Sequence, residues 1–174
     1  MKTILAFSLL LPLFGGIIYT KASGSNKKPE GAVVSYSYCY RATMAYPRLY
    51  YQVGRDSSGT VCIAWQKEHC PDVTIIRSSD EVLKRIEAIA AQYRLHIIKR
   101  IYTPSVQVLD GTSWDAYLRY EKGSISSSGS NAKAPKKLMD GIYAINDYIQ
   151  SQIVASSESD IIAKSEYYEY SRKH

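Results

Sequence analysis

Residues 35–40 read Ser-Tyr-Ser-Tyr-Cys-Tyr, and this alternation constrains the fold more than any other stretch of the chain. Successive side chains of a β-strand point to opposite faces of a sheet. A period of two therefore predicts a strand with three tyrosines on one face and small residues on the other. Strands are also expected at 49–53 and 61–65, because Asp-Ser-Ser-Gly at 56–59 has the composition of a hairpin turn. These three segments predict an antiparallel meander.

Two later stretches place apolar residues at helical spacing. Ser78 and Glu81 form the residue pair of a capping box, so a helix is expected to begin there. Its apolar face comprises Val82, Leu83, Ile86, Ile89, Ala90 and Tyr93. Pro135 suits the first turn of a second helix. The apolar stripe of that helix comprises Leu138, Ile142, Ile145, Ile149 and Ile153.

A second hairpin is expected between the two helices. One strand would carry Trp114, Ala116, Leu118 and Tyr120 on one face, and residues 124–128 would return after a turn at 121–123. A sheet with one apolar face and two amphipathic helices packs most simply as two layers. We therefore predict an α+β domain in which both helices cover one face of a single, mostly antiparallel sheet.

The first residues have the pattern of an export signal. Lys2 supplies the positive end, an apolar run extends over 4–18, and Thr-Lys-Ala at 20–22 offers the small residues that a signal peptidase reads. The apolar run is short for a stable membrane span. We therefore expect removal of residues 1–22 and a protein that is periplasmic or secreted, with no membrane span after the signal is removed.

The rest of the chain divides by composition into three parts. Residues 23–31 are polar and are expected to form a flexible leader, and residues 32–154 are expected to form the single α+β domain. After residue 155 the chain becomes rich in Ser and Glu. This polar tail, 155–174, is expected either to be mobile or to extend the last helix.

Charge and motifs exclude several classes of function. The net charge of +6 falls to +4 when residues 1–22 are removed, because Lys2 and Lys21 leave with no acid. Export and so mild an excess argue against a nucleic-acid partner. The sequence has no P-loop, no Cys-x-x-Cys, no His-Glu-x-x-His and no Gly-x-Ser-x-Gly pattern. We therefore expect no cofactor and no metal.

Three cysteines fall within the predicted domain: Cys39, Cys62 and Cys70. An oxidising compartment permits a disulfide without requiring one. Cys62 and Cys70 are the better pair, because one lies in a predicted strand and the other just beyond it. A bridge between them would close the strand's exit loop, and the sequence leaves open whether it forms.

Tyrosine is unusually abundant, with sixteen in the chain. A tyrosine ring buries a large area while it loses few rotatable bonds, which suits adaptable contacts with a partner. The predicted partner-binding residues are Tyr36, Tyr38, Tyr40 and Trp114. The alternative is that these rings belong to the core, since β-sheets favour tyrosine in any case.

A small-residue loop precedes the second predicted helix. Backbone N–H groups and ammonium groups near a helix start can hold a phosphate or a carboxylate. The residues of this predicted anion site are Ser128, Gly129, Ser130, Asn131, Lys133 and Lys136. The alternative is a polar loop whose serines bond to the local backbone and whose lysines are solvated.

A family resemblance rests on the same part of the chain. Asp110-Gly111, Trp114, Gly123 and residues 128–131, followed by a proline and an amphipathic helix, resemble small exported bacterial domains of unknown function that are common in Bacteroidetes-type bacteria. The resemblance covers about residues 105–150. It implies export and an α+β domain, and it brings no catalytic residues.

Two functions are compatible with these patterns. The first is an exported, non-enzymatic domain that binds a protein or glycan partner in the cell envelope or outside, for instance an inhibitor or immunity-type protein. The second is a hydrolase of cell-wall or glycan material that uses acids near Asp110 and Asp115. A hydrolase would need several carboxylates that converge in one concave pocket.

Overall fold

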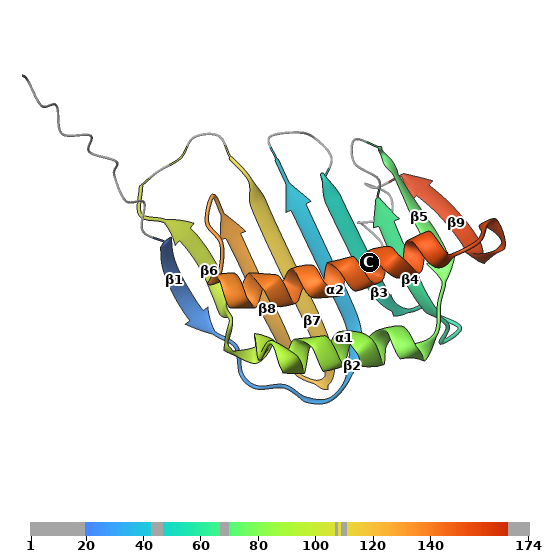
Figure 1. Cartoon of the computed structure of the whole chain (residues 1–174), viewed down its shortest axis with the longest axis horizontal. Coiled ribbons are helices and arrows are strands. Elements are labelled where there is room, and N and C mark those ends of the chain that lie inside the picture. Colours follow the sequence, from blue (N-terminus) through green and yellow to red (C-terminus); the bar gives the residue numbers. More distant parts are fainter. Residues whose placement is uncertain (1–19, 43–46, 67–69, 107, 109–110, 167–174) are drawn as a thin grey trace, which may run out of the picture.

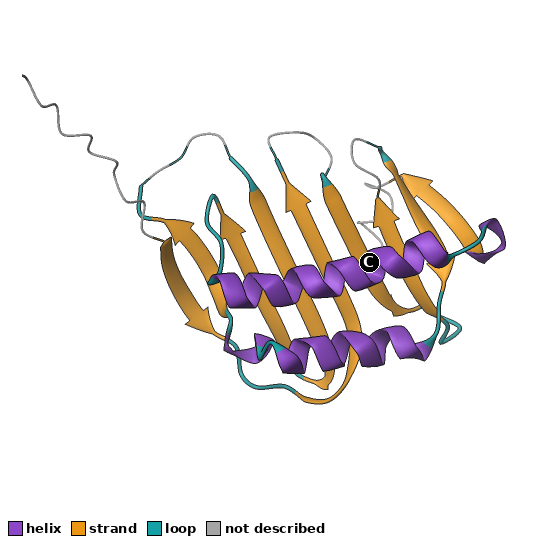
Figure 2. Cartoon of the chain, viewed as in Figure 1, coloured by secondary structure: helices purple, strands orange, loops and turns teal. Residues whose placement is uncertain are grey.

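The alternating segment forms the second half of a long strand at the centre of a single sheet (Figure 1). The computed structural model describes residues 20–42, 47–66, 70–106, 108 and 111–166. Nine strands build one open sheet, and two helices pack against one of its faces (Figure 2). The predicted α+β class, with a mostly antiparallel sheet and both helices on one face, is therefore confirmed.

The strands follow one another across the sheet in the order β1-β6-β8-β7-β2-β3-β4-β5-β9. Their bounds are β1 Thr20–Ser25, β2 Glu30–Arg41, β3 Leu49–Arg55, β4 Val61–Gln66, β5 Asp72–Arg77, β6 Lys99–Pro104, β7 Ser113–Lys122, β8 Ser124–Ser130 and β9 Ile161–Glu166. All neighbouring strands pair antiparallel except β6 and β8, which are parallel. The predicted meander is β2-β3-β4, and the second hairpin is β7-β8.

The helices run side by side across the sheet (Figure 1). Helix α1 covers Asp80–Gln92 and helix α2 covers Lys136–Ala155, with short 3₁₀ turns at Leu95–Ile97 and Glu158–Asp160. The predicted apolar stripes are their buried faces: Ile86, Ile142, Ile145 and Ile149 are almost completely inaccessible to solvent. Burying one such side chain contributes about 2 kcal/mol to folding, so these stripes hold the two layers together.

The first helix starts one residue later than the capping-box pattern predicts. Ser79 is the N-cap, and its side chain makes no capping hydrogen bond. The Ser78 N–H instead donates to the Val61 carbonyl oxygen at 2.8 Å. Ser78 therefore still belongs to the end of the sheet, and the predicted capping box is wrong.

The leader and the tail contain strands that composition does not indicate. Strand β1 joins the last residues of the predicted signal, 20–22, to the first of the predicted leader, 23–25, and it pairs with β6 although all its residues are exposed. The Asn26 amide links β8 to the residue that precedes β6, because its Nδ2 donates to the carbonyl oxygens of Ile98 and Ser126. At the other end, β9 pairs with β5, so this part of the predicted tail is a strand and not an extension of the last helix. Both strands lie at sheet edges, where backbone pairing needs no apolar pattern.

Candidate binding site

Several of the predicted site residues line one pocket on the helix side of the sheet. In Figure 1 the strands β2, β3 and β7 extend past α2 on the side away from α1. The pocket lies at these strand ends and has a volume of about 680 Å³, within the usual range for ligand sites. Its described lining, hereafter the aromatic pocket, is Thr20, Tyr38, Tyr40, Leu49, Thr112, Trp114, Asn131, Ala132, Lys133 and Tyr143.

Trp114 fixes one wall of the aromatic pocket. It lies on β7 opposite Tyr40 of β2 and is only 4% exposed. Its Nε1 donates to the Ala132 carbonyl oxygen at 2.7 Å, which ties the β8–α2 connection to the sheet. A Cβ on Gly129 would lie 2.3 Å from both of these atoms. The close approach of indole and connection therefore requires glycine at this position of β8.

Tyr38 contributes a phenol to the pocket. The side chain is 3% exposed and lines the pocket, and its hydroxyl makes no hydrogen bond with another described residue. Burial raises the pKa of this phenol well above its ordinary value, and the nearby phenols of Tyr143 and Tyr40 raise it further. The hydroxyl is therefore neutral and available to a ligand.

The rim of the pocket is built by a link between two distant loops. The Thr112 N–H donates to Asn131 Oδ1 at 2.8 Å, and the Asn131 N–H donates to the Thr112 carbonyl oxygen at 2.8 Å. Asn131 adopts a left-handed backbone with φ of 49°, a conformation that asparagine tolerates better than most residues. A Cβ on Gly111 would lie 1.5 Å from Asn131 Oδ1, so only glycine fits beside it.

Two lining residues give the pocket an accessible polar edge. Tyr143 comes from α2 and is 38% exposed. Lys133 is exposed and forms no ion pair with a described residue. Among the described residues that line the pocket there is one cation and no carboxylate.

Tyr36 does not belong to this site, which corrects one of the predicted partner-binding residues. It is 2% exposed beneath α2, and its hydroxyl donates to Asn146 Oδ1 at 2.7 Å. Burial is the main cause that raises the pKa of its phenol. Of the three alternating tyrosines, Tyr36 lies farthest from the end of β2 at the aromatic pocket. The helices therefore cover it completely, and its side chain is part of the hydrophobic core.

The predicted anion site at the helix start is not assembled. Ser128, Gly129 and Ser130 lie within β8, because the strand continues beyond the predicted 124–128. Helix α2 begins only at Lys136, whose Nζ pairs with Asp140 Oδ2 at 2.8 Å. Of the six predicted residues, the pocket brings together only Asn131 and Lys133.

The predicted Cys62–Cys70 disulfide is also absent, since both of these cysteines are free thiols. Cys62 lies near the start of β4, whereas the Cys70 carbonyl oxygen accepts a hydrogen bond from Gln66 Nε2 at the end of that strand. A strand rises about 3.3 Å per residue, so the four steps from Cys62 to Gln66 span about 13 Å. That distance exceeds what a disulfide bridges.

Sequence reasoning missed Tyr143, the pocket's link to α2. One signal was present in the sequence: an aromatic residue follows Ile142 directly and falls outside the apolar stripe of the helix. A large ring at such a position either meets solvent or extends over the neighbouring layer. Leu49 and Thr112 also line the pocket, and no pattern marks them as site residues. Thr20 lines it too, although it belongs to the segment that the sequence predicts to be removed as an export signal.

The opposite face of the sheet carries a second, more polar groove of about 750 Å³. The ion pair between Arg41 and Asp115, at 2.8 Å, lies there together with Tyr117 and Arg119. Asp115 therefore points away from the aromatic pocket, and Asp110 lies outside the described residues. Asp115 is the single carboxylate among the described residues that line this groove.

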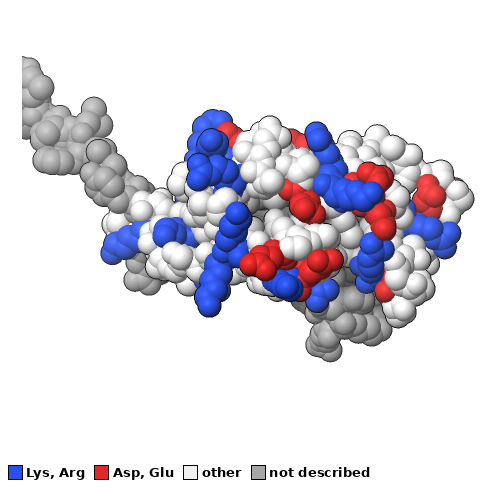
Figure 3. All heavy atoms as spheres, turned by 90° about the horizontal axis from the view of Figure 1, so that it is seen from below, with Lys and Arg blue, Asp and Glu red and all other residues white. Residues whose placement is uncertain are grey.

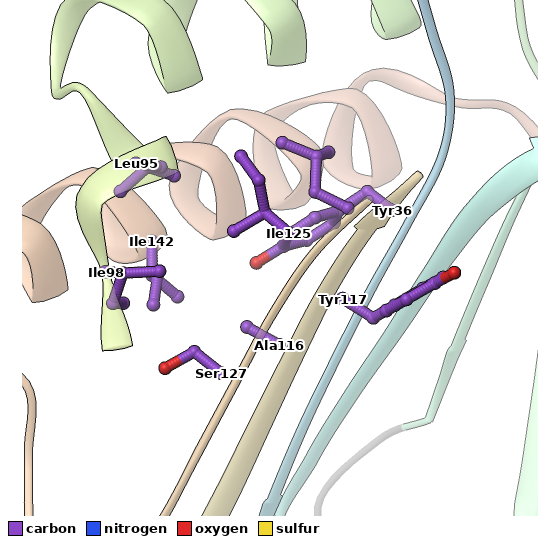
Figure 4. A pocket seen from close by; sticks show the side chains of 9 residues that line it. Tyr36, Leu95, Ile98, Ala116, Tyr117, Ile125, Ser127 and Ile142 are labelled. Atoms are coloured by element: carbon purple, nitrogen blue, oxygen red, sulfur yellow. The ribbon is translucent and has the colours of Figure 1, made fainter. Parts of the chain in front are cut away.

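A third cavity lies inside the core between the helices and the sheet (Figure 4). Its volume is about 20 Å³, and its walls are mostly aliphatic, with Leu95, Ile98, Ile125 and Ile142. Tyr117 points away from this cavity, toward the other face of the sheet (Figure 4). The cavity has room for about one water molecule and lacks the polar groups that would hold it.

Charge and metal-binding groups indicate no further site. Seen from below, Lys and Arg side chains lie beside Asp and Glu side chains across the centre of the surface (Figure 3). Among the described residues, no three His, Cys, Asp or Glu side chains lie close enough to hold a metal ion. No helix in the described part of the chain is long and apolar enough to cross a membrane.

Comparison with known proteins leaves the pocket as the main guide to function. No protein-family model, curated protein or solved structure matches the chain. The resemblance to exported domains of unknown function therefore stays a prediction, as does the export signal, because residues 1–19 lie outside the described residues.

Proposed function

We propose that this protein is an exported, non-enzymatic binding domain that engages a protein or glycan partner in the cell envelope or outside through the aromatic pocket. The observation that carries the proposal is the convergence of three phenols, an indole and one lysine in a single pocket of about 680 Å³. Aromatic and hydrogen-bonding side chains around a concave site are typical of ligand recognition. An inhibitor or immunity-type protein is one form that such a domain can take.

The hydrolase alternative has less support from the geometry. It needs an acid and a second carboxylate on the two sides of a substrate bond. Asp115 lies on the other face of the sheet in an ion pair with Arg41, and the described lining of the aromatic pocket offers no acid to replace it. No observation on the described residues favours this second function.

The test compares two exposed tyrosines on opposite faces of the molecule. Tyr143 lines the pocket and is 38% exposed, whereas Tyr117 lies in the opposite groove and is 40% exposed. Tagged wild-type protein, Tyr143→Ala and Tyr117→Ala would each be used to capture partners from an envelope extract of the producing cell. We expect Tyr143→Ala to lose a partner that the wild type and Tyr117→Ala both retain.

Capture by all three proteins alike would contradict the proposal. Both residues are partly solvated, so neither change should unfold the domain. Equal thermal transitions of the three proteins would verify that the loss of capture reflects the pocket and not the fold.

A further inference from the structure

The aromatic pocket has a charge that nothing within its described lining balances. Lys133 is exposed, forms no ion pair with a described residue, and meets no carboxylate among the residues that line the pocket. The neighbouring Lys136 differs, because Asp140 accepts its ammonium at 2.8 Å. An unpaired ammonium at the edge of a concave site favours a ligand with a negative charge.

The polar groups of the pocket indicate that the ligand also carries hydroxyl groups. Tyr38 is 3% exposed and lines the pocket, and its hydroxyl has no hydrogen-bond partner among the described residues. A phenol hydroxyl can donate one hydrogen bond and accept another, so it can pair with a hydroxyl group of a ligand. Tyr40, Tyr143 and Thr112 add hydroxyl groups that can donate or accept.

The position of the pocket favours a sugar over an extended peptide. A peptide that adds to a sheet needs an open strand edge. Here β2 is paired on both sides, by β3 and β7, and β7 is paired by β2 and β8. A sugar ring needs no strand edge, since it offers an apolar face to aromatic rings and a rim of hydroxyl groups to polar side chains.

From these three observations we infer that the aromatic pocket binds a carboxylate-bearing sugar unit of a glycan. Lys133 meets the carboxylate, the phenol of Tyr38 meets a ring hydroxyl, and the rings of Tyr40 and Tyr143 contact the apolar face of the sugar. This inference rests on the proposed binding function and names its ligand class.

The test uses three matched pairs of sugars: glucuronate with glucose, galacturonate with galactose, and N-acetylmuramate with N-acetylglucosamine. Saturation-transfer NMR on the full-length chain would rank each acid against its neutral counterpart. We expect at least one acid to bind more tightly than its neutral counterpart. In Lys133→Gln the affinity for that acid should fall about tenfold, because a charge-assisted hydrogen bond is lost.

Two further variants distinguish the contribution of the Lys133 charge to affinity from that of the Tyr38 hydroxyl. Lys136→Gln removes a neighbouring lysine that does not line the pocket, so the affinity should not change. Tyr38→Phe removes only the Tyr38 hydroxyl and should weaken the acid and its neutral counterpart by the same factor, about threefold to tenfold. That variant breaks no hydrogen bond to a described residue, so its thermal transition should stay near that of the wild type.

The inference is overturned if no acid binds better than its neutral counterpart, or if Lys133→Gln binds the acid as tightly as the wild type. If no sugar binds while Tyr143→Ala still loses the envelope partner, the ligand class is wrong and the binding function stands. If Tyr143→Ala keeps the partner, the binding function itself fails.

Discussion

Gly129 is where the sheet, the indole of Trp114 and the connection to α2 meet. Trp114 Nε1 donates to the Ala132 carbonyl oxygen, and both atoms occupy the space that a side chain at position 129 would need. The conflict is steric, since a Cβ would lie 2.3 Å from each of them. This residue therefore positions the wall and the rim of the aromatic pocket together.

The close contact of Gly129 with Trp114 and Ala132 can be tested by adding a methyl group. Gly129→Ala should lower the free energy of unfolding by about 2 kcal/mol, because the extra methyl group forces the indole or the connection to move. Gly54→Ala is the matched control on β3, where a Cβ meets nothing closer than 3.4 Å, so its effect should stay below about 1 kcal/mol. Urea denaturation measures both, and equal effects of the two changes would contradict the account.

The buried phenols lead to a prediction at alkaline pH. Burial is the largest cause that raises the pKa of Tyr36, Tyr38 and Tyr120, the last to about 12. In the unfolded chain these phenols ionise near pH 10. Above that pH the unfolded state therefore holds fewer protons than the folded state. The stabilisation that the neutral buried phenols give the folded state is fully present below about pH 10. It is lost as the pH rises toward the pKa values of these phenols in the folded state.

The free energy of unfolding should accordingly fall between about pH 10 and pH 12. Urea denaturation at stepped pH values would measure the fall, and Tyr120→Phe should make it shallower because one raised phenol is removed. A free energy of unfolding that stays level across this range would contradict the burial of these side chains.

Much of the pocket could be predicted residue by residue, and the omissions have a physical cause. Tyr38, Tyr40 and Trp114 stand out as aromatics on one face of their strands, and Asn131 and Lys133 stand out after a small-residue stretch. Which tyrosine is covered depends on where α2 crosses the strand, and no local pattern specifies that position. Tyr36 was therefore assigned wrongly, and Tyr143 was missed.

At the scale of elements, the strands at the two sheet edges differ most from expectation. The meander β2-β3-β4, the hairpin β7-β8 and both helices were predicted, because their apolar patterns follow from packing against the other layer. The strands β5 and β6 were not predicted. Strand β1 has only exposed residues, and β9 has at most partly buried ones among those described. Backbone pairing with β6 and β5 forms these strands, and pairing between distant segments leaves no mark in local composition.

Amide hydrogen exchange tests strand β9. Residues 161–165 pair with β5 along one edge only, so we expect amides that face β5 to be protected and those that face solvent to exchange quickly. Exchange measured by NMR resolves this alternation. Uniform exchange at the rate of an unfolded chain would show instead that the segment is the mobile tail that composition predicts.

The length of β4 keeps Cys62 and Cys70 too far apart to form a disulfide. Because Cys62 lies near one end of β4 and Cys70 lies beside its other end, these two thiols should be free in the purified protein, with no gain of mass on reduction. Cys62 and Cys70 are partly exposed and should be alkylated before the buried Cys39. A mass that increases under reducing conditions would overturn this assignment.

At the scale of the whole molecule, the sheet separates two different surfaces. The face toward the helices holds the larger hydrophobic core and, beyond α2, the aromatic pocket. The other face holds the polar groove with the Arg41–Asp115 ion pair and a smaller buried cluster of Cys39, Tyr50, Ala64 and Val73. The alternation in β2 produces this division, because Tyr38 and Tyr40 face one side and Ser37 and Cys39 the other. The sequence therefore indicated that β2 has two unlike faces, and the crossing of α2 decides which tyrosines a ligand can reach.

Photo-crosslinking tests most directly whether the partner contacts the aromatic pocket. A photoreactive amino acid would replace Tyr143 in one variant and Tyr117 in another, and each would be irradiated with an envelope extract of the producing cell. The account predicts a covalent adduct with the partner from position 143 and none from position 117. An adduct from position 117 alone, or equal adducts from both positions, would contradict the claim that the aromatic pocket is the binding site.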